Sequence, residues 1–379
     1  MPDFDPHRGP QATREPNRLN RLLSVLMANL RTAWIGLGVL FFVMVVIPGA
    51  LLIYQSSGKG DQHQADQQQA KQPCEGIHPG AIRKGKIAFD LADEAAPVVQ
   101  DPEGGIAAPD VWTVNPNGSD PVNLTADSRY SDEHPAWSPD GRRIAFHRRS
   151  VADLSEWICV VGPDSSDSIE ISPPEGEILS EPSWSPDGRT ITFWTTTTTN
   201  IYLANADGSG TPKRLPTPRF SGTVTRPEWS PDGDRMAFEG TDEDSGNNLY
   251  VMNVSPEGHT SGLRRLTDAD NRFFQHVQEA PAWSPDGTQI AFSTNLDRQF
   301  EIYKIDVKSL RMTRLTHTPR NVADTQPTWS PDGEQIAYVK QKLARGTHSS
   351  IYRMDSDGSH STPVFEEERK YAFNPDWAP

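Results

Sequence analysis

Apolar residues follow two different patterns along the chain. Residues 33–54 form an uninterrupted run of 22 residues that carries no charged side chain. From residue 85 onward, apolar residues occur instead in short segments such as IAF and IYL, between turns rich in Pro, Asp and Gly. A long apolar run is typical of a membrane-spanning helix, whereas short segments bounded by turn residues are typical of β-strands. The pattern therefore predicts one membrane helix followed by an all-β region.

The apolar run is long enough to remain in the membrane as an uncleaved anchor. As a helix it spans about 33 Å at 1.5 Å per residue, against a hydrocarbon core of about 30 Å. A cleaved signal peptide is the alternative, but its apolar stretch would cover only about 7–15 residues. The residues before the run carry five arginines and three carboxylates, and a positively charged flank stays in the cytoplasm. We therefore expect a single-pass protein of the cell membrane with a cytoplasmic N-terminus and an extracytoplasmic (periplasmic or extracellular) C-terminal region.

The segment after the run, residues 55–74, is polar and of low complexity. Such a composition cannot bury a core, so this segment is predicted to be a flexible linker. The chain then divides into a cytoplasmic tail (1–32), a transmembrane helix (33–54), the linker (55–74) and an exported β domain (75–379).

One motif recurs throughout the exported region. The segment PAWSPDGRRIAF begins at Pro135, and related segments begin at Pro182, Pro227, Pro281 and Pro327. Pro, Asp and Gly favour tight turns, because Pro presets φ and Gly accepts a positive φ, so each motif predicts a β-hairpin. The motif tryptophans recur at intervals of 45 to 54 residues. We expect them to pack between neighbouring repeats, at Trp137, Trp184, Trp229, Trp283, Trp329 and Trp377.

The two ends of this region share one further repeat. Residues 374–379 (NPDWAP) give its first half, and residues 85–89 (GKIAF) give its second half. Pairing of the last strand with the first would close a ring and remove the exposed sheet edges. Counting the halves together predicts an all-β, six-bladed β-propeller with four strands in each blade.

The W-S-P-D-G turns and the I-A-F-like strands after them resemble the TolB-like family of WD-repeat-like β-propellers. The resemblance covers about residues 84–379. TolB itself carries an α/β domain before its propeller and binds the peptidoglycan-associated lipoprotein through the propeller. Here only residues 55–84 separate the predicted anchor from the first strand. The resemblance therefore implies a membrane-anchored member without that N-terminal domain.

The repeats are alike at the S-P-D-G turns and differ at the other ends of their strands. In a propeller, the loops before the inner strand and those between the second and third strands share one face, at one mouth of the central channel. We place His147, Arg148 and Arg149 in one of these loops. Loops on a rigid scaffold commonly recognise ligands, and drift of surface loops is the alternative. The candidate binding face comprises Glu133, His134, Arg148, Arg149, Glu181, Arg226, Glu279, Gln326 and Asn374.

Charge and composition narrow the partners and the metal chemistry. The chain has 36 basic and 51 acidic residues and a net charge of −15, which gives no electrostatic reason to bind nucleic acid. A protein or an envelope component is the expected partner, and the oligomeric state is left open. His134, Glu133 and Glu181 are an alternative metal set, but no closely spaced ligand motif is present. We therefore predict neither a metal nor a cofactor.

The two cysteines, Cys74 and Cys159, can pair in an oxidising compartment. A disulfide requires Cα atoms within about 7 Å, which the sequence does not show, so the pairing stays open.

No catalytic motif emerges from the sequence. The Ser–Asp pair of the S-P-D-G turn occurs five times, which indicates turn structure, because an active site usually occurs once. The chain also lacks the G-x-S-x-G nucleophile elbow. We predict a binding scaffold or sensor subunit rather than an enzyme. Two alternatives stay open: a lyase or hydrolase that uses His134, Glu181 and Arg226 at the mouth, and a transmembrane signalling receptor.

Overall fold

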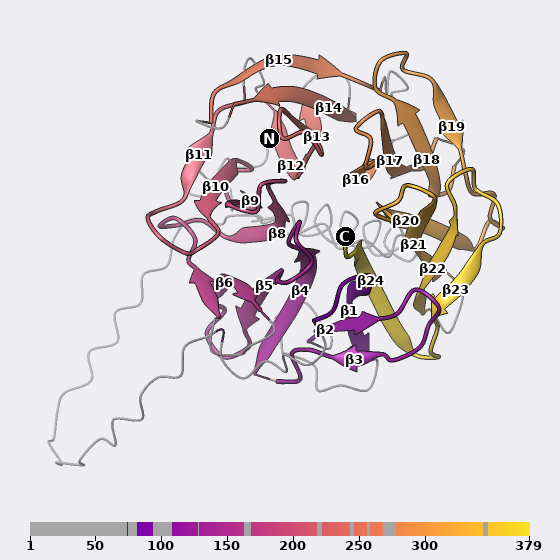
Figure 1. The fold of residues 1–379 in the computed structure, drawn as a ribbon, viewed down its shortest axis with the longest axis horizontal. Coiled ribbons are helices and arrows are strands. Elements are labelled where there is room, and N and C mark those ends of the chain that lie inside the picture. The colour runs from indigo at the N-terminus through magenta and orange to yellow at the C-terminus, as the bar shows by residue number, and fades with distance from the viewer. Residues whose placement is uncertain are drawn as a thin grey trace, which may run out of the picture. The chain divides into compact units, whose positions relative to one another are not determined.

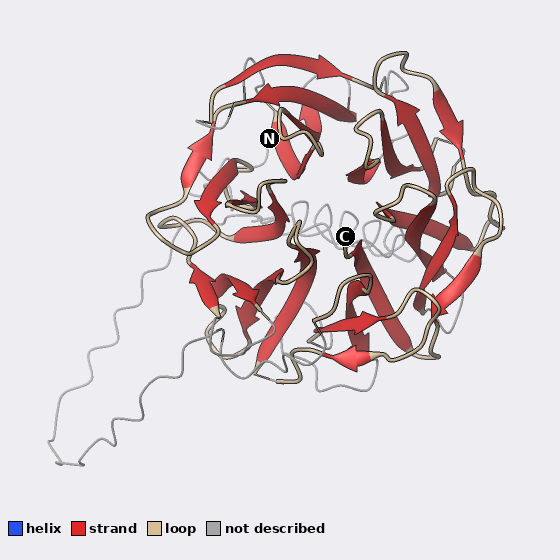
Figure 2. Cartoon of the chain, in the orientation of Figure 1, coloured by secondary structure: helices blue, strands red, loops and turns tan. Residues whose placement is uncertain are grey.

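The structure is a computed structural model that describes Cys74, residues 82–93 and residues 108–379, apart from positions 128, 163–167, 218–221, 243–245, 256–257, 268–277, 297 and 344–347. The regular elements in this part of the chain are β-strands (Figure 2). The predicted tail, membrane helix and all of the linker except Cys74 lie outside the described residues. Among the described residues, we find no helix with the length and apolar character that a membrane crossing requires.

The strands form sheets that radiate around a central axis, as in a β-propeller (Figure 1). Four of the sheets have four antiparallel strands each. The first contains β4 (Tyr130–Trp137), β5 (Ile144–Ser150), β6 (Glu156–Val161) and β7 (Ile169–Ile171). The second contains β8 (Leu179–Trp184), β9 (Thr190–Thr195), β10 (Ile201–Asn205) and β11 (Lys213–Leu215). The third contains β12 (Thr223–Trp229), β13 (Arg235–Asp242), β14 (Gly246–Val254) and β15 (Thr260–Arg265), and the fourth contains β16 (Gln278–Trp283), β17 (Gln289–Thr294), β18 (Glu301–Asp306) and β19 (Met312–Arg314).

An eight-stranded sheet joins the two ends of the described chain. Its strands are β20 (Val322–Trp329), β21 (Gln335–Lys342), β22 (Ser349–Asp355), β23 (Thr362–Phe365), β24 (Lys370–Trp377), β1 (Ile87–Asp93), β2 (Asp110–Val114) and β3 (Val122–Asn123). The C-terminal strand β24 pairs with β1 in antiparallel fashion at six positions, from Ile87 opposite Trp377 to Asp93 opposite Lys370. This pairing is the closure that the split repeat predicted.

The S-P-D-G segments form the turns between the first two strands of the sheets. In the first, the Ser138 hydroxyl donates to Asp140 at 2.6 Å and accepts from the Arg143 backbone N–H at 2.9 Å. Gly141 takes a φ of 65°, which a residue with a Cβ adopts only at a cost. The same Ser-to-Asp bond closes the other four turns, at Ser185, Ser230, Ser284 and Ser330. These serines and aspartates therefore have the structural role predicted for them.

The motif tryptophans are buried and lie between neighbouring sheets. Trp184, for example, packs in one apolar cluster with Ala145 and Ile158 of the preceding sheet. Its indole N–H also donates to the Ala136 carbonyl of that sheet at 3.0 Å. Burial of a large apolar side chain stabilises a fold by about 1.5–3 kcal/mol. The tryptophans thus join each sheet to the next.

Cys74 and Cys159 form a disulfide with a Cα–Cα distance of 5.5 Å. Both residues are buried in one apolar cluster with Trp137 and Phe146. The bond joins residue 74, before the first strand, to β6 across a sequence separation of 85. The pairing that the sequence left open is therefore made in the structure.

One placement from the sequence was wrong. His147, Arg148 and Arg149 belong to strand β5 rather than to a loop. They pair across the sheet with β4, where Glu133 lies opposite His147. The hairpin continues past the I-A-F segment because polar residues on both strands face each other, and the loop begins only at residue 151.

Candidate functional site at the channel mouth

The strands nearest the channel contain the segment Pro-x-Trp (P-x-W) that begins each repeat. They carry a β-bulge at the proline and the residue before it. The register of β4 with β5, for instance, shifts between Glu133 and Ala136. Proline cannot donate to the ladder, and a bulge is one of the places where a strand tolerates it. The residue before the proline has a positive φ, of 46° to 56°, at His134, Glu181, Arg226, Gln326 and Asn374. We call these five residues the mouth ring.

One arc of the mouth ring is held by amide and carboxylate groups. The Gln326 side-chain amide donates to Asn374 Oδ1 at 2.6 Å, and the Asn374 backbone N–H donates back to Gln326 Oε1 at 2.9 Å. Asn374 Nδ2 donates to Asp90 Oδ1 at 2.9 Å, and the same oxygen accepts from the His134 backbone N–H at 3.3 Å. Side chains of different sheets therefore fix one another around the mouth.

The other arc is an ion-pair chain centred on Glu181. Its Oε1 lies 3.2 Å from His134 Nε2 and 3.0 Å from Arg226 Nε. Its Oε2 accepts from the Trp194 indole N–H at 3.1 Å. Arg226 Nη1 also lies 3.5 Å from Glu239 Oε1. The mouth ring thus presents a fixed pattern of charges rather than freely moving side chains.

Burial and neighbouring charges shift the pKa values in this network. Burial alone would raise the pKa of Glu181, but Arg226 and His134 outweigh it and hold that pKa well below its usual range. Burial would lower the pKa of His134, but Glu181, Asp90 and Glu133 outweigh it and raise that pKa to about 9. Burial raises the pKa of Asp90 to about 7 against the opposing effect of His134. Near neutral pH the imidazolium of His134 is therefore paired with the Glu181 carboxylate.

A second group of carboxyls lies deeper in the channel, in the middle of the P-x-W segments. Glu228 accepts from the Ser183 hydroxyl at 2.7 Å, and Asp376 accepts from the Trp137 backbone N–H at 2.6 Å. Burial raises the pKa of Glu228 to about 8 and that of Asp376 to about 6. A cavity of about 120 Å³ connects this level to the mouth ring, lined by Glu181, Pro182, Ser183, Arg226, Pro227, Glu228, Pro281 and Asn374.

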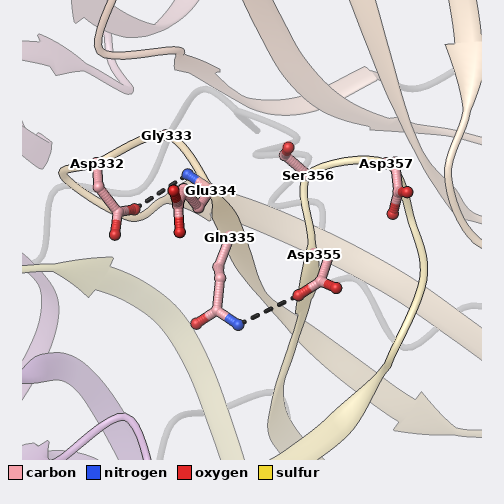
Figure 3. A pocket seen from close by; sticks show the side chains of 7 residues that line it. All are labelled: Asp332, Gly333, Glu334, Gln335, Asp355, Ser356 and Asp357. Atoms are coloured by element: carbon pink, nitrogen blue, oxygen red, sulfur yellow. Dashed lines mark hydrogen bonds between the residues drawn. The ribbon is translucent and has the colours of Figure 1, made fainter.

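A larger pocket, of about 630 Å³, lies on the opposite face among the S-P-D-G turns (Figure 3). Two of its carboxylates already have structural contacts: Asp332 accepts from the Glu334 backbone N–H in a turn at 3.0 Å, and Asp355 accepts from the Gln335 amide of the neighbouring strand at 3.4 Å. None of the predicted binding-face residues lines it. We therefore keep the channel mouth as the candidate site.

The remaining predicted residues divide into three groups. Glu133 and Arg149 are partly exposed beside the mouth ring. Arg148 is only 1% exposed, and its guanidinium binds Asp132 through Nε at 2.6 Å and Nη2 at 2.7 Å. Arg148 therefore belongs to the sheet interior and not to the binding face. Glu279 lies on β16, and its side chain falls outside the described residues.

Sequence reasoning missed several carboxylates of the mouth and channel: Asp90, Glu228, Glu239 and Asp376. Glu228 and Asp376 occupy the middle position of P-x-W, so alignment of the repeats could have shown that this position also varies. Asp90 and Glu239 lie on the second strand of their repeats, one residue after the phenylalanine of the I-A-F-like segment. Alignment of these second strands could have identified both residues in the same way.

Exposed apolar side chains lie on the same face as the mouth ring. Of five large hydrophobic residues that are exposed among the described ones, Leu310 lies on a loop of the opposite face. The other four lie on loops at the mouth end of the sheets, where Leu154 is 61% exposed: Leu154, Ile178, Leu296 and Leu343. These four side chains add apolar contact area to the face that holds the mouth ring.

Two family models match successive parts of the chain. Residues 110–270 match the model of the Lipoprotein LpqB beta-propeller domain, and residues 270–379 match that of the TolB beta propeller domain. Both matches support a TolB-like β-propeller, as the repeats indicated.

Solved structures support the same fold. TolB from Acinetobacter baumannii is 21% identical, with a TM-score of 0.60 over 78% of this chain and 67% of that chain. A putative TolB from Agrobacterium tumefaciens is 19% identical, with a TM-score of 0.51 over 78% of this chain and 100% of that chain. A chain of a Nidogen/Laminin complex is 10% identical, with a TM-score of 0.56 over 78% and 99% of the two chains. At these identities the likeness shows the fold alone, and no curated protein matches this sequence.

Proposed function

We propose that this TolB-like β-propeller is a membrane-anchored, exported scaffold or sensor subunit that binds a protein partner at the channel mouth. The observation that carries the proposal is the mouth itself: a fixed ring of polar side chains on the face that also carries exposed Leu154, Ile178, Leu296 and Leu343. Fixed polar groups and apolar side chains on one face suit a protein partner, because the apolar side chains supply contact area and the charges supply specificity.

The propeller would have six blades. The eight-stranded sheet divides naturally into two four-stranded units, β20 to β23 and β24 with β1 to β3. Between them β22 and β24 share a single parallel pair, Ser349 with Tyr371. Counted with the four separate sheets, these two units would give the six blades of the proposal.

The partner would offer a basic segment to the mouth. The described mouth and channel carboxyls are Asp90, Glu133, Glu181, Glu228, Glu239 and Asp376, against His134, Arg149 and Arg226. A Lys or Arg side chain entering the channel would favour the ionised form of Glu228, which burial disfavours. Such a contact would weaken as salt rises, because exposed charges are screened over about 10 Å at 0.1 M salt.

The proposed membrane anchor is the apolar run at residues 33–54. Export of the β domain is consistent with the Cys74–Cys159 disulfide. The full chain is expected in the membrane fraction, from which only detergent extracts it. Release of the protein by alkaline carbonate would contradict the anchor.

Partner capture by the full chain tests the role of the mouth. The protein is solubilised gently, and co-purifying proteins are identified for the wild type and for the charge swap Glu181→Arg with Arg226→Glu. The swap keeps an ion pair between the two positions but moves the positive charge, so a stoichiometric partner should be reduced at least about 10-fold, equivalent to about 1.4 kcal/mol.

The matched control is Glu334→Arg, a charge reversal at an exposed residue of the S-P-D-G face. It should capture the partner as the wild type does. Equal capture by the charge swap would remove the mouth from the proposal. An equal loss of captured partner in the charge swap and in the control would show a nonspecific effect of charge and would also contradict the proposal.

A further inference from the structure

Two histidines and a carboxylate converge beside the mouth ring. Glu133 and His134 lie on β4, and His147 lies directly opposite Glu133 on β5. One donor atom from each of these three residues comes within 4.8 Å of the others. The bulge at His134 makes this convergence, because it turns two consecutive β4 side chains toward the same neighbour.

The ring nitrogens in this cluster are buried without a hydrogen-bond partner among the described residues. They are His134 Nδ1 and His147 Nε2, and His147 is only 9% exposed. Glu156 Oε2 is also buried and without a partner, 3.6 Å from His147 Nε2. Buried polar atoms are normally hydrogen-bonded, so these three atoms have capacity for a ligand that the described protein groups do not supply.

The surrounding contacts orient these donors as metal ligands are usually oriented. The Glu181 carboxylate lies 3.2 Å from His134 Nε2 and retains the proton on that nitrogen, so a metal ion that binds Nδ1 displaces the second proton of the imidazolium. The Ser131 hydroxyl donates to Glu133 Oε1 at 2.8 Å. The other oxygen, Glu133 Oε2, lies 4.0 Å from His134 Nδ1. Glu181 is held in turn by Arg226 at 3.0 Å.

We propose that Glu133, His134 and His147 bind a divalent transition-metal ion, with the Glu156 carboxylate beside His147. Imidazole nitrogens suit Zn²⁺ and its first-row neighbours, whereas Ca²⁺ and Mg²⁺ take oxygen ligands. Bonds of about 2.1 Å place tetrahedral donors about 3.4 Å apart, so the side chains close by roughly an ångström on binding. The carboxylates of Glu133, Glu156 and Glu181 balance the charge of the ion.

This site goes beyond the proposed partner binding and does not depend on it. Metal affinity is measured on the purified protein alone, and partner capture is measured on protein treated with a chelator. Each proposal can therefore fail while the other stands.

The test uses the full chain in detergent, first stripped with a chelator. Co²⁺ is titrated into it and followed by visible absorption, and Zn²⁺ is then used to displace the Co²⁺. The wild type is expected to bind one ion, with an absorption spectrum typical of mixed nitrogen and oxygen ligands. Glu133→Gln and His147→Gln are each expected to weaken metal binding by at least about 100-fold. That is the upper end of the loss caused by removing a residue that only orients a metal ligand.

The matched control is His360→Gln, because His360 is exposed and lies 2.7 Å from Asp355, away from the cluster. It should bind the ion as the wild type does. Circular dichroism and a melting curve check that each variant folds. If His147→Gln does not fold, the metal affinity of Glu133→Gln, at a partly exposed residue, tests the site. Absence of saturable binding by the wild type, or unchanged affinity in Glu133→Gln, would overturn the proposal and leave these residues as a histidine–carboxylate ion-pair cluster.

Discussion

Glu228 shows how a single channel residue couples the fold to pH. Burial raises its pKa to about 8 from an ordinary 4.5, with Asp376 adding to the rise and the Ser183 hydroxyl opposing it. Between these values the folded protein holds a proton that the unfolded chain has released, so the free energy of unfolding falls as pH rises from about 4.5 to 8. Glu228→Gln should lack this part of the decline and be more stable than the wild type above pH 8, by about 1–3 kcal/mol.

Urea unfolding of the full chain at several pH values measures this difference. Glutamine keeps an oxygen that accepts from Ser183, so the variant isolates the charge. The control is Glu334→Gln, at an exposed residue, which should keep the wild-type pH profile. Parallel profiles for Glu228→Gln and the wild type would contradict the raised pKa.

The hairpin turn is the element on which the repeats are built. In the fourth four-stranded sheet, Ser284 is buried, donates to Asp286 at 2.6 Å and accepts from the Gln289 backbone N–H at 2.9 Å. Ser284→Ala removes both contacts and leaves the Gln289 N–H without this acceptor. The expected loss is about 1–2 kcal/mol of unfolding free energy, read as a lower urea midpoint at unchanged slope.

Ser172→Ala provides the comparison for the turn. Ser172 is exposed and makes only a 3.4 Å contact to Glu170, so its midpoint should stay within error of the wild type. A Ser284→Ala midpoint equal to that of Ser172→Ala would show that the turn is held by Pro, Asp and Gly alone.

Elements built on the repeat were predictable, and elements outside it were less so. The S-P-D-G turns could be predicted because their residue types act locally, through preset or positive φ and a hydroxyl-to-carboxylate bond two residues apart. The length of β5 could not, because His147 to Arg149 are polar and pair only through their register with β4. A strand that continues through polar residues looks like a loop in a single sequence.

The candidate site could likewise be predicted from the sequence only in part. The repeats placed all five mouth-ring residues on the candidate binding face, because the residues that precede each P-x-W occupy equivalent positions around the closed ring. It did not bring His147 beside His134, since that contact needs both the bulge and the cross-strand register. Arg148 was assigned to the surface because a charged side chain favours exposure, whereas its bidentate contact with Asp132 allows burial.

For the whole molecule, the disulfide adds a covalent tie to the ring of strand pairings. Cys74 and Cys159 enclose 85 residues, and a closed loop of that length stabilises the fold by about 4.6 kcal/mol in the chain-entropy model, above the roughly 2–4 kcal/mol that disulfides typically contribute. Reduction of the full chain, or replacement of both cysteines by serine, should therefore lower the free energy of unfolding by about 2–4 kcal/mol. The double serine variant should not respond to reductant, which separates the disulfide from other effects of the reagent. Equal mobility of the wild type on reducing and non-reducing gels would contradict the disulfide. Equal unfolding free energy with and without reductant would show that the pairing of β24 with β1 already holds the ring closed.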